Sequence, residues 1–216
     1  MSVKIIVATH KQYRMPEESC YLPLHVGKEG KIDLGYSGDN TGDNISEKNS
    51  YFCELTGMYW SWKNLDEDYI GLSHYRRHFV KPSLLSFLSK DKFENILSEN
   101  QIVDLMKDVD VLLPIRRNYW IETVYQQYVH AHSEDSMERI KQIIKSKYPE
   151  YEDSLNTVLN RRYCHLFNMF IMKKEVFHEY CKWFFDILFE LESTYNQNGI
   201  NNAPKRLYGF ASERLM

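Results

Sequence analysis

The sequence predicts a single α/β domain built on a largely parallel sheet flanked by helices. Apolar stretches of strand length alternate along the chain with amphipathic stretches of helix length, an order typical of such sheets. With 216 residues, 43% of them hydrophobic and 26% charged, the chain can bury one full-sized core. Neither a repeat nor a low-complexity tract marks a boundary, so we treat residues 1–216 as one domain.

Four apolar stretches predict the strands. Residues 3–9 form a run rich in β-branched side chains, which predicts a parallel strand buried on both faces. A second short run, at residues 69–73, follows a polar turn. Residues 109–114 and 166–172 complete the set, because both are largely apolar over the length of a strand.

Helical periodicity fills most of the intervals between these strands. Between residues 49 and 64, Phe52, Leu55 and Tyr59 recur at three- and four-residue spacing and predict one amphipathic helix. Further helical segments are predicted near residues 83–107, 121–132, 134–147, 151–160 and 174–195, with the first turns of another at 207–216. Residues 12–49 read as one long irregular loop, and loops of that length usually carry function.

The charge balance and the cysteines narrow the class of protein. With 27 basic and 30 acidic residues the net charge is −3, so the overall charge gives no indication of a nucleic-acid partner. The 4 cysteines are scattered, which predicts free thiols in a reducing compartment rather than disulfides or a zinc ribbon. No secretory signal is recognised and no stretch reaches membrane-spanning length. We therefore expect a cytoplasmic protein, with peripheral membrane attachment left open.

The strongest candidate site follows the predicted strand 69–73. There the chain continues with His74, Arg76 and Arg77, and the carboxyl end of a strand is where open α/β sheets bind ligands. Adjacent guanidinium groups favour an anion, and a phosphate fits their forked donors. The alternative is that one arginine faces a surface carboxylate and the other faces solvent. The pair Arg116–Arg117 is a weaker version of the same pattern.

Motifs for metal and nucleotide chemistry are misplaced or missing. Two acidic patterns, 66–68 and 108–110, precede their strands and so belong to the opposite edge of the sheet. The histidines lack the spacing and nearby glutamate of a zinc protease, and Gly-x-Ser-x-Gly, P-loop and dinucleotide fingerprints are not found. No metal site is therefore assigned, although a divalent cation, Mn²⁺ or Mg²⁺, is not ruled out as a cofactor.

Two further features leave alternatives open. The polar loop 38–46 could bind a phosphate, ribose or base, or it could be a chain of Asx turns that holds itself together. Glu213 could act as a general base in a cleft. Its alternative is an ordinary glutamate near a helix start, interacting with the helix dipole or with Arg214.

Taken together, the motifs resemble those of a bacterial family catalogued as domain of unknown function 4422, found in capsular and exopolysaccharide gene clusters. Members of that family are regarded as glycosyltransferases. The similarity covers nearly the whole chain. The segments that carry it are KIIVATHK (4–11), GDNTGDNIS (38–46), ELTGMYWSWKN (54–64), YIGLSHYRR (69–77), NMFIMKK (168–174) and GFASERL (209–215).

The resemblance implies a GT-A-like, Rossmann-type fold with a nucleotide-sugar half near residues 1–115 and an acceptor half near 116–216. It places His74, Arg76, Arg77 and Glu213 among the catalytic residues, with Glu213 as the base if the reaction inverts. The donor would be bound by residues of the first strand end and the polar loop: Thr9, His10, Lys11, Asp39, Asn40, Thr41, Asp43 and Asn44. Asn168 and Met169 would contact the acceptor.

The expected function is transfer of a hexose from a nucleotide sugar to a lipid-linked glycan at the inner face of the plasma membrane. UDP-hexose is the expected donor, with galactose and galactofuranose as the named candidates. Two rival functions stay open: a non-catalytic module that binds a nucleotide sugar or carbohydrate, and a nucleotidyltransferase, which would require a metal ion.

Overall fold

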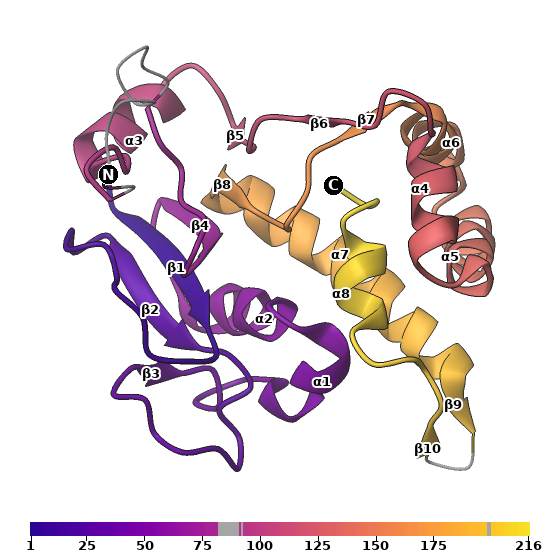
Figure 1. Ribbon diagram of the computed structural model, residues 1–216, viewed down its shortest axis with the longest axis horizontal. Coiled ribbons are helices and arrows are strands. Elements are labelled where there is room, and N and C mark those ends of the chain that lie inside the picture. Colours follow the sequence, from indigo (N-terminus) through magenta and orange to yellow (C-terminus); the bar gives the residue numbers. More distant parts are fainter. Residues whose placement is uncertain (82–90, 92, 198–199) are drawn as a thin grey trace.

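The computed structural model describes residues 1–81, 91, 93–197 and 200–216. Within these ranges six strands form one sheet, in which four neighbouring strands are parallel and one strand is antiparallel to both of its neighbours (Figure 1). In spatial order they are β3 (Ser37–Gly38), β2 (Tyr21–His25), β1 (Val3–Thr9), β4 (Tyr69–His74), β8 (Phe170–Lys173) and β5 (Val111–Leu112). This arrangement confirms the predicted α/β class with a mostly parallel sheet.

Strand β1 lies inside the sheet and is buried on both faces. Ile6 and Ala8 belong to the larger of two hydrophobic clusters, which includes residues of the long helix α7 (Lys174–Tyr195). Ile5 and Val7 point to the other face and belong to the second cluster, together with Ile102. Burial on both faces explains why the strand is apolar without interruption, as predicted.

Helices cover both faces of the sheet. The longest, α7, packs against strands β4 and β8 and against three other helices, so it anchors the larger cluster. Figure 1 shows α4, α5 and α6 gathered on the far side of α7 and α8 from the sheet. The helices are α1 (Asn49–Phe52), α2 (Leu55–Asn64), α3 (Glu99–Met106), α4 (Val124–Ala131), α5 (Glu134–Lys147), α6 (Glu152–Asn160), α7 (Lys174–Tyr195) and α8 (Leu207–Ser212).

Short elements connect these layers. Two 3₁₀ turns, η1 (Ser46–Lys48) and η2 (Pro149–Tyr151), precede α1 and α6. Two small antiparallel pairs complete the described structure: β6 (Arg117–Asn118) with β7 (Tyr163–Cys164), and β9 (Asn196–Gln197) with β10 (Ile200–Asn201).

The loop predicted at residues 12–49 is wrong in part, because it contains β2 and β3. The sequence pattern did not predict β2 because the strand contains Pro23, and proline is rare inside strands. The backbone of Cys20 and that of Val26 bond to β1. Because backbone groups alternate in direction along a strand, the backbone nitrogen of Pro23 faces away from β1, towards β3. Strand β3 pairs only with Leu24 and His25. The missing N–H therefore breaks no bond of the sheet.

Other predicted bounds also shift. The helix predicted over 49–64 is broken at Cys53, whose φ is 55°, so α1 and α2 are separate. The strand predicted over 166–172 begins only at Phe170, because Phe167 and Asn168 have left-handed backbones. The strand predicted over 109–114 covers Val111–Leu112. Of the helical segments predicted near 83–107, only α3 is a helix in the described part, and residues 82–90 and 92 lie outside it. None of the helices in the described ranges has the length and apolar content needed to cross a bilayer.

His78, which packs against Tyr21 of the second hydrophobic cluster, should make the stability of the fold sensitive to acid. Its ring packs near those of Tyr21 and Phe93, and burial lowers the pKa of His78 to about 4. The unfolded chain takes up a proton near pH 6.5, whereas the folded chain does so only near pH 4. The stabilisation that neutral His78 provides above pH 6.5 should therefore be lost as the pH falls from 6.5 to 4. Because the residue as a whole is only half-buried, we expect a loss of roughly 1–2 kcal/mol, below the full linkage value.

Urea unfolding at pH 7.5 and pH 5 would measure this loss. The variant His78→Phe, which cannot titrate, should lose less stability on acidification than the wild-type protein. Equal losses in the two proteins would show that another group is responsible.

Candidate active site

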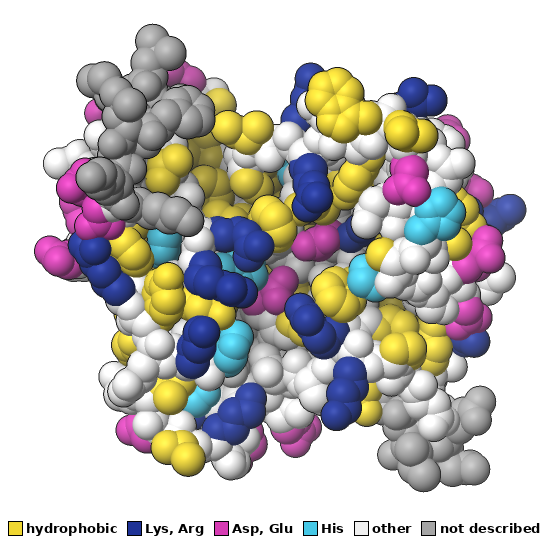
Figure 2. All heavy atoms as spheres, viewed as in Figure 1, with side chains coloured by type: hydrophobic (Ala, Val, Ile, Leu, Met, Phe, Trp, Pro, Cys, Tyr) yellow, Lys and Arg dark blue, Asp and Glu magenta, His cyan; other side chains and the backbone are white. Residues whose placement is uncertain are grey.

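A cavity of about 890 Å³ opens at the carboxyl ends of β1 and β4. Its walls include His10, just after β1, and residues 74–77 at the end of β4. The lining also includes the junction of α1 and α2, the segment that leads into β8, α8, and residues between Arg117 and His132. On the face seen in Figure 2, Lys and Arg side chains gather around a hollow near the centre, with acidic side chains among them. The cavity thus lies at the sheet edge where ligands bind in open α/β folds.

Arginines dominate the cavity wall. Arg76, Arg77, Arg117 and Arg206 all line it. Within the described ranges, the arginines that have a carboxylate partner within 4.0 Å are Arg14, Arg139 and Arg214. The alternative in which one arginine of the 76–77 pair faces a surface carboxylate is therefore not seen there. Instead, the Arg77 guanidinium lies 4.1 Å from the centre of the Phe167 ring, and Arg76 lies 5.0 Å from that of Tyr75.

Two histidines in the cavity respond to this positive charge. The pKa of His10 is lowered, first by burial and then by the cations Lys11, Lys31, Arg76 and Arg206. The pKa of His132 is lowered by burial and by two arginines. Both shifts mean that the cavity disfavours further positive charge, and the same field favours an anionic ligand.

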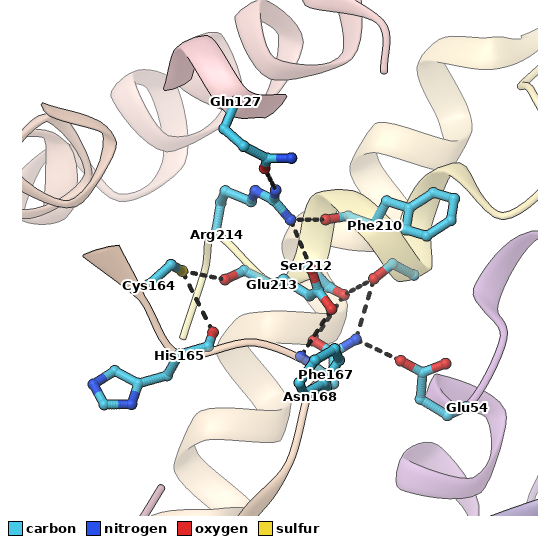
Figure 3. A network of polar contacts seen from close by, with 11 residues as sticks. Glu54, Gln127, Cys164, His165, Phe167, Asn168, Phe210, Ser212, Glu213 and Arg214 are labelled. Carbon is cyan, nitrogen blue, oxygen red and sulfur yellow. Dashed lines mark hydrogen bonds and ion pairs between the residues drawn. The ribbon is translucent and has the colours of Figure 1, made fainter. Parts of the chain in front are cut away.

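Three carboxylates line the cavity with the arginines: Glu54, Glu122 and Glu213. Glu122 lies 2.6 Å from Nδ1 of His130, whereas Glu54 and Glu213 contact the segment that leads into β8. The backbone N–H of Phe167 donates to Oε1 of Glu213 at 2.8 Å, and the Arg214 guanidinium donates to Oε2 at 2.8 Å (Figure 3). Burial raises the pKa of Glu213, and the nearby Glu54 adds to this, whereas Arg214 and the Phe167 N–H partly offset the shift.

The turn at Phe167 and Asn168 connects three of the residues in the site. Its left-handed backbone, with φ of 77° and 51°, turns successive groups in different directions. The Phe167 N–H meets Glu213, while its carbonyl lies 2.6 Å from Nε2 of His74. The Asn168 amide donates to Oε1 of Glu54 at 2.8 Å (Figure 3). One turn therefore fixes the positions of two acids and a histidine.

Left-handed residues other than glycine cluster at this cavity. Cys53, Phe167 and Arg206 line it, and the other two described cases, Trp120 and Asn168, are sequence neighbours of lining residues. Such backbones cost free energy and persist where surrounding contacts enforce them, commonly at functional sites. Burial and Glu54 raise the pKa of the Cys53 thiol to about 11, which disfavours its reactive thiolate form.

The structure separates the residues predicted to bind the donor. His10 lines the cavity, whereas Thr9 and Lys11 do not. Thr9 is buried, and its hydroxyl donates to the backbone carbonyl of Lys11. The polar loop also lies outside the cavity wall, and its side chains bond within the loop, to Glu29 and to α2. These contacts involve Asp39, Asn40, Thr41, Asp43 and Asn44.

The residues predicted to bind the acceptor are buried beneath the cavity. Asn168 is 1% exposed and supports Glu54 from below, and Met169 belongs to the second hydrophobic cluster. All four residues predicted to be catalytic line the cavity: His74, Arg76, Arg77 and Glu213. Their roles, and those of the donor and acceptor residues, remain predictions.

Sequence reasoning missed Glu54, Arg117 and Arg206 as members of the site. Glu54 looks like an ordinary residue of the predicted helix 49–64, and only the break at Cys53 turns it into the cavity. Arg206 lies just before α8, in a stretch where the sequence pattern predicts no strand, although β10 ends at Asn201. Arg117 was noted in the sequence only as a weak anion-binding pattern.

No protein-only metal cluster is found among the described side chains, and a divalent cation as cofactor stays a prediction. Across the described ranges, no group of three or more His, Cys, Asp or Glu side chains is arranged to hold one. The acidic patterns before the strands are engaged elsewhere: Asp66 pairs with Lys174 at 2.5 Å and Asp110 pairs with Lys173 at 2.7 Å. We therefore derive no step through a metal.

Comparisons with known proteins place the chain in a family. The sequence profile of a domain of unknown function, DUF4422, matches residues 4–216. The chain belongs to this family. A solved structure described as the apo form of WbbM, a bifunctional glycosyltransferase, is similar over 100% of this chain, with 34% identity and a TM-score of 0.87. This chain spans only 41% of that chain. The likeness confirms the GT-A-like fold, and a search of curated proteins gave no match.

The buried carboxylate of Asp39 gives the polar loop its structural role. It accepts hydrogen bonds from the N–H groups of Gly27 and Lys28 and from the hydroxyls of Ser46 and Thr56, at 2.5–3.1 Å. Asp39→Ala would leave these four donors without an acceptor. We expect it to lower the free energy of unfolding by about 3–5 kcal/mol, measured by urea denaturation.

Asp43→Ala is the matched control, because Asp43 lies in the same loop but is exposed. It should cost no more than about 1 kcal/mol. Similar losses in both variants would contradict the structural role assigned to Asp39.

Proposed function

We propose that this chain is a glycosyltransferase that moves a hexose from a nucleotide-sugar donor to a glycan acceptor. The observation that carries the proposal is the convergence of four arginines without carboxylate partners, among the described residues, on a cavity that is also lined by carboxylates. Membership of DUF4422 and the likeness to a bifunctional glycosyltransferase support it.

The arginines suit the diphosphate of the donor. Arg76 and Arg77 at the end of β4 could accept its charge by forked hydrogen bonds, and Arg206 faces the same cavity. Fixed cations that meet the departing nucleoside diphosphate stabilise the charge that develops in the transition state. On this proposal a divalent cation is not required.

The reaction then needs one proton acceptor. The acceptor hydroxyl oxygen forms a bond to the anomeric carbon of the sugar, and the bond from that carbon to the phosphate oxygen breaks. The electron pair of the broken bond leaves on the nucleoside diphosphate, and the hydroxyl proton passes to a carboxylate. Of the three lining carboxylates, Glu122 is paired with His130, and Glu54 and Glu213 are the two that contact the Phe167–Asn168 turn. The family resemblance favours Glu213.

The finer assignment rests on the family resemblance. We extend the proposal to UDP-hexose as donor, with galactose or galactofuranose as the sugar, and to a lipid-linked glycan of a capsular or exopolysaccharide as acceptor. The donor would be bound mainly by residues 1–115 and the acceptor by residues 116–216. A lipid-linked acceptor would bring the protein to the inner face of the plasma membrane.

The charge-neutralising role is tested by replacing the arginines at the end of β4. Arg76→Ala and Arg77→Ala should each weaken binding of a nucleoside diphosphate by about tenfold or more, because each removes charged hydrogen bonds. Titration calorimetry with UDP and other nucleoside diphosphates, without added metal, measures this.

Arg116→Ala is the matched control, because Arg116 is exposed and lies against Tyr163 rather than in the cavity wall. It should bind within about twofold of the wild type. If both cavity variants also bind like the wild type, Arg76 and Arg77 do not bind the diphosphate. Binding without transfer or hydrolysis of any nucleotide sugar would favour a non-catalytic module, and pyrophosphate release with strict cation dependence would favour a nucleotidyltransferase.

A further inference from the structure

Glu54 and Glu213, the two cavity carboxylates that contact the Phe167–Asn168 turn, differ in what their oxygens contact. Both oxygens of Glu213 already accept hydrogen bonds, one from the Phe167 N–H and one from the Arg214 guanidinium. The Arg214 side chain is 2% exposed, so this pair is shielded from water. A proton acceptor needs a lone pair that faces its substrate. Glu213 would have to give up one of these charged contacts to provide it.

Glu54 keeps one oxygen open. Its Oε1 accepts from the Asn168 amide at 2.8 Å, and within the described ranges no donor contacts Oε2. Because Glu54 lines the cavity, this second oxygen is available to a ligand there. Figure 3 shows the carboxylate reaching from the α1–α2 junction towards Asn168, with its other oxygen outside the hydrogen-bonded network.

The support for Glu54 is rigid and specific. The Asn168 side chain is buried, and its orientation is set because Oδ1 accepts from the Ser212 hydroxyl at 3.1 Å. Its amide nitrogen is thereby directed to Glu54 and to the Gly209 carbonyl. On the other side, the left-handed backbone of Cys53 turns the chain immediately before Glu54. Strained backbone on both sides of one hydrogen bond holds this carboxylate in place.

We propose that Glu54 takes the proton of the acceptor hydroxyl, and that Glu213 positions the Phe167–Asn168 turn and Arg214. The inference rests on the proposed glycosyl transfer and changes which acid serves it. As the bond from the acceptor oxygen to the anomeric carbon forms, the O–H proton passes to Oε2 of Glu54, and the nucleoside diphosphate leaves with the electron pair of its broken bond. The other charged side chains and histidines that line the cavity with Glu54 are His10, His74, Arg76, Arg77, Arg117, Glu122, His132, Arg206, Glu213 and Arg214.

The test compares Glu54→Gln with Glu213→Gln in the full chain. The probe is turnover of each nucleotide sugar that the wild-type protein binds, to water or to simple glycosides, followed as nucleoside diphosphate release over pH 4–9. Glu54→Gln should lower turnover about 10²–10⁴-fold while nucleoside diphosphate affinity stays within about threefold, and its rate should lose the acid-side fall of the pH profile. Glu213→Gln should be less impaired and keep that fall.

Two further variants keep the test decisive. Glu54→Asp retains the carboxylate but withdraws it by one methylene, so it should keep the acid-side fall with reduced turnover. It also replaces Glu54→Gln if thermal unfolding shows that the latter does not fold. Glu175→Gln, an exposed glutamate on α7, is the matched control and should turn over at the wild-type rate.

The outcomes separate the two levels of proposal. If Glu54→Gln turns over normally while Glu213→Gln loses turnover and the acid-side fall, Glu213 is the proton acceptor and the inference is overturned, although glycosyl transfer stands. If the wild-type chain binds nucleotide sugars but turns over none of them, the proposed function fails, and the role of Glu54 fails with it.

Discussion

Two consecutive left-handed residues, Phe167 and Asn168, determine how the site is assembled. They lie just before β8. The N–H and the carbonyl of Phe167 reach Glu213 and His74, and the side-chain amide of Asn168 reaches Glu54. Those partners come from the end of β4, the start of α2 and the end of α8. A regular strand through this segment would send alternate groups to opposite faces of the sheet and could not gather them. The strain of the turn is therefore coupled to the geometry of the cavity.

The balance of charge around the cavity follows from this framework. Glu213 is held beside Arg214, whereas the arginines at the end of β4 rest on the rings of Tyr75 and Phe167. Aromatic faces offer these guanidinium groups a weak attraction without neutralising them. The cavity thus retains positive charge for a ligand, and this is the property on which the proposed diphosphate binding depends.

The polar loop contributes in a different way. Asp39 is fully buried, and its four hydrogen bonds tie the segment just after β2 and the start of α2 to the loop. This matches the interpretation of residues 38–46 as a loop that holds itself together. By fixing α2, the loop also fixes the break at Cys53, after which Glu54 enters the cavity. Its effect on the site is indirect.

The sequence by itself determined the local elements and one wall of the site. Residues 134–147 and 174–195 were predicted as helices and are helices at those bounds, because apolar periodicity is a local property. The strand end that carries His74, Arg76 and Arg77 was also readable, since strand ends in parallel sheets converge. Only the tertiary structure decided the antiparallel direction of β8, the pairing of β2 and β3, and the contact between Glu54 and Asn168. That hydrogen bond joins residues 114 apart in the chain, and left-handed turns at Cys, Phe and Asn leave no periodic pattern by which to foresee it.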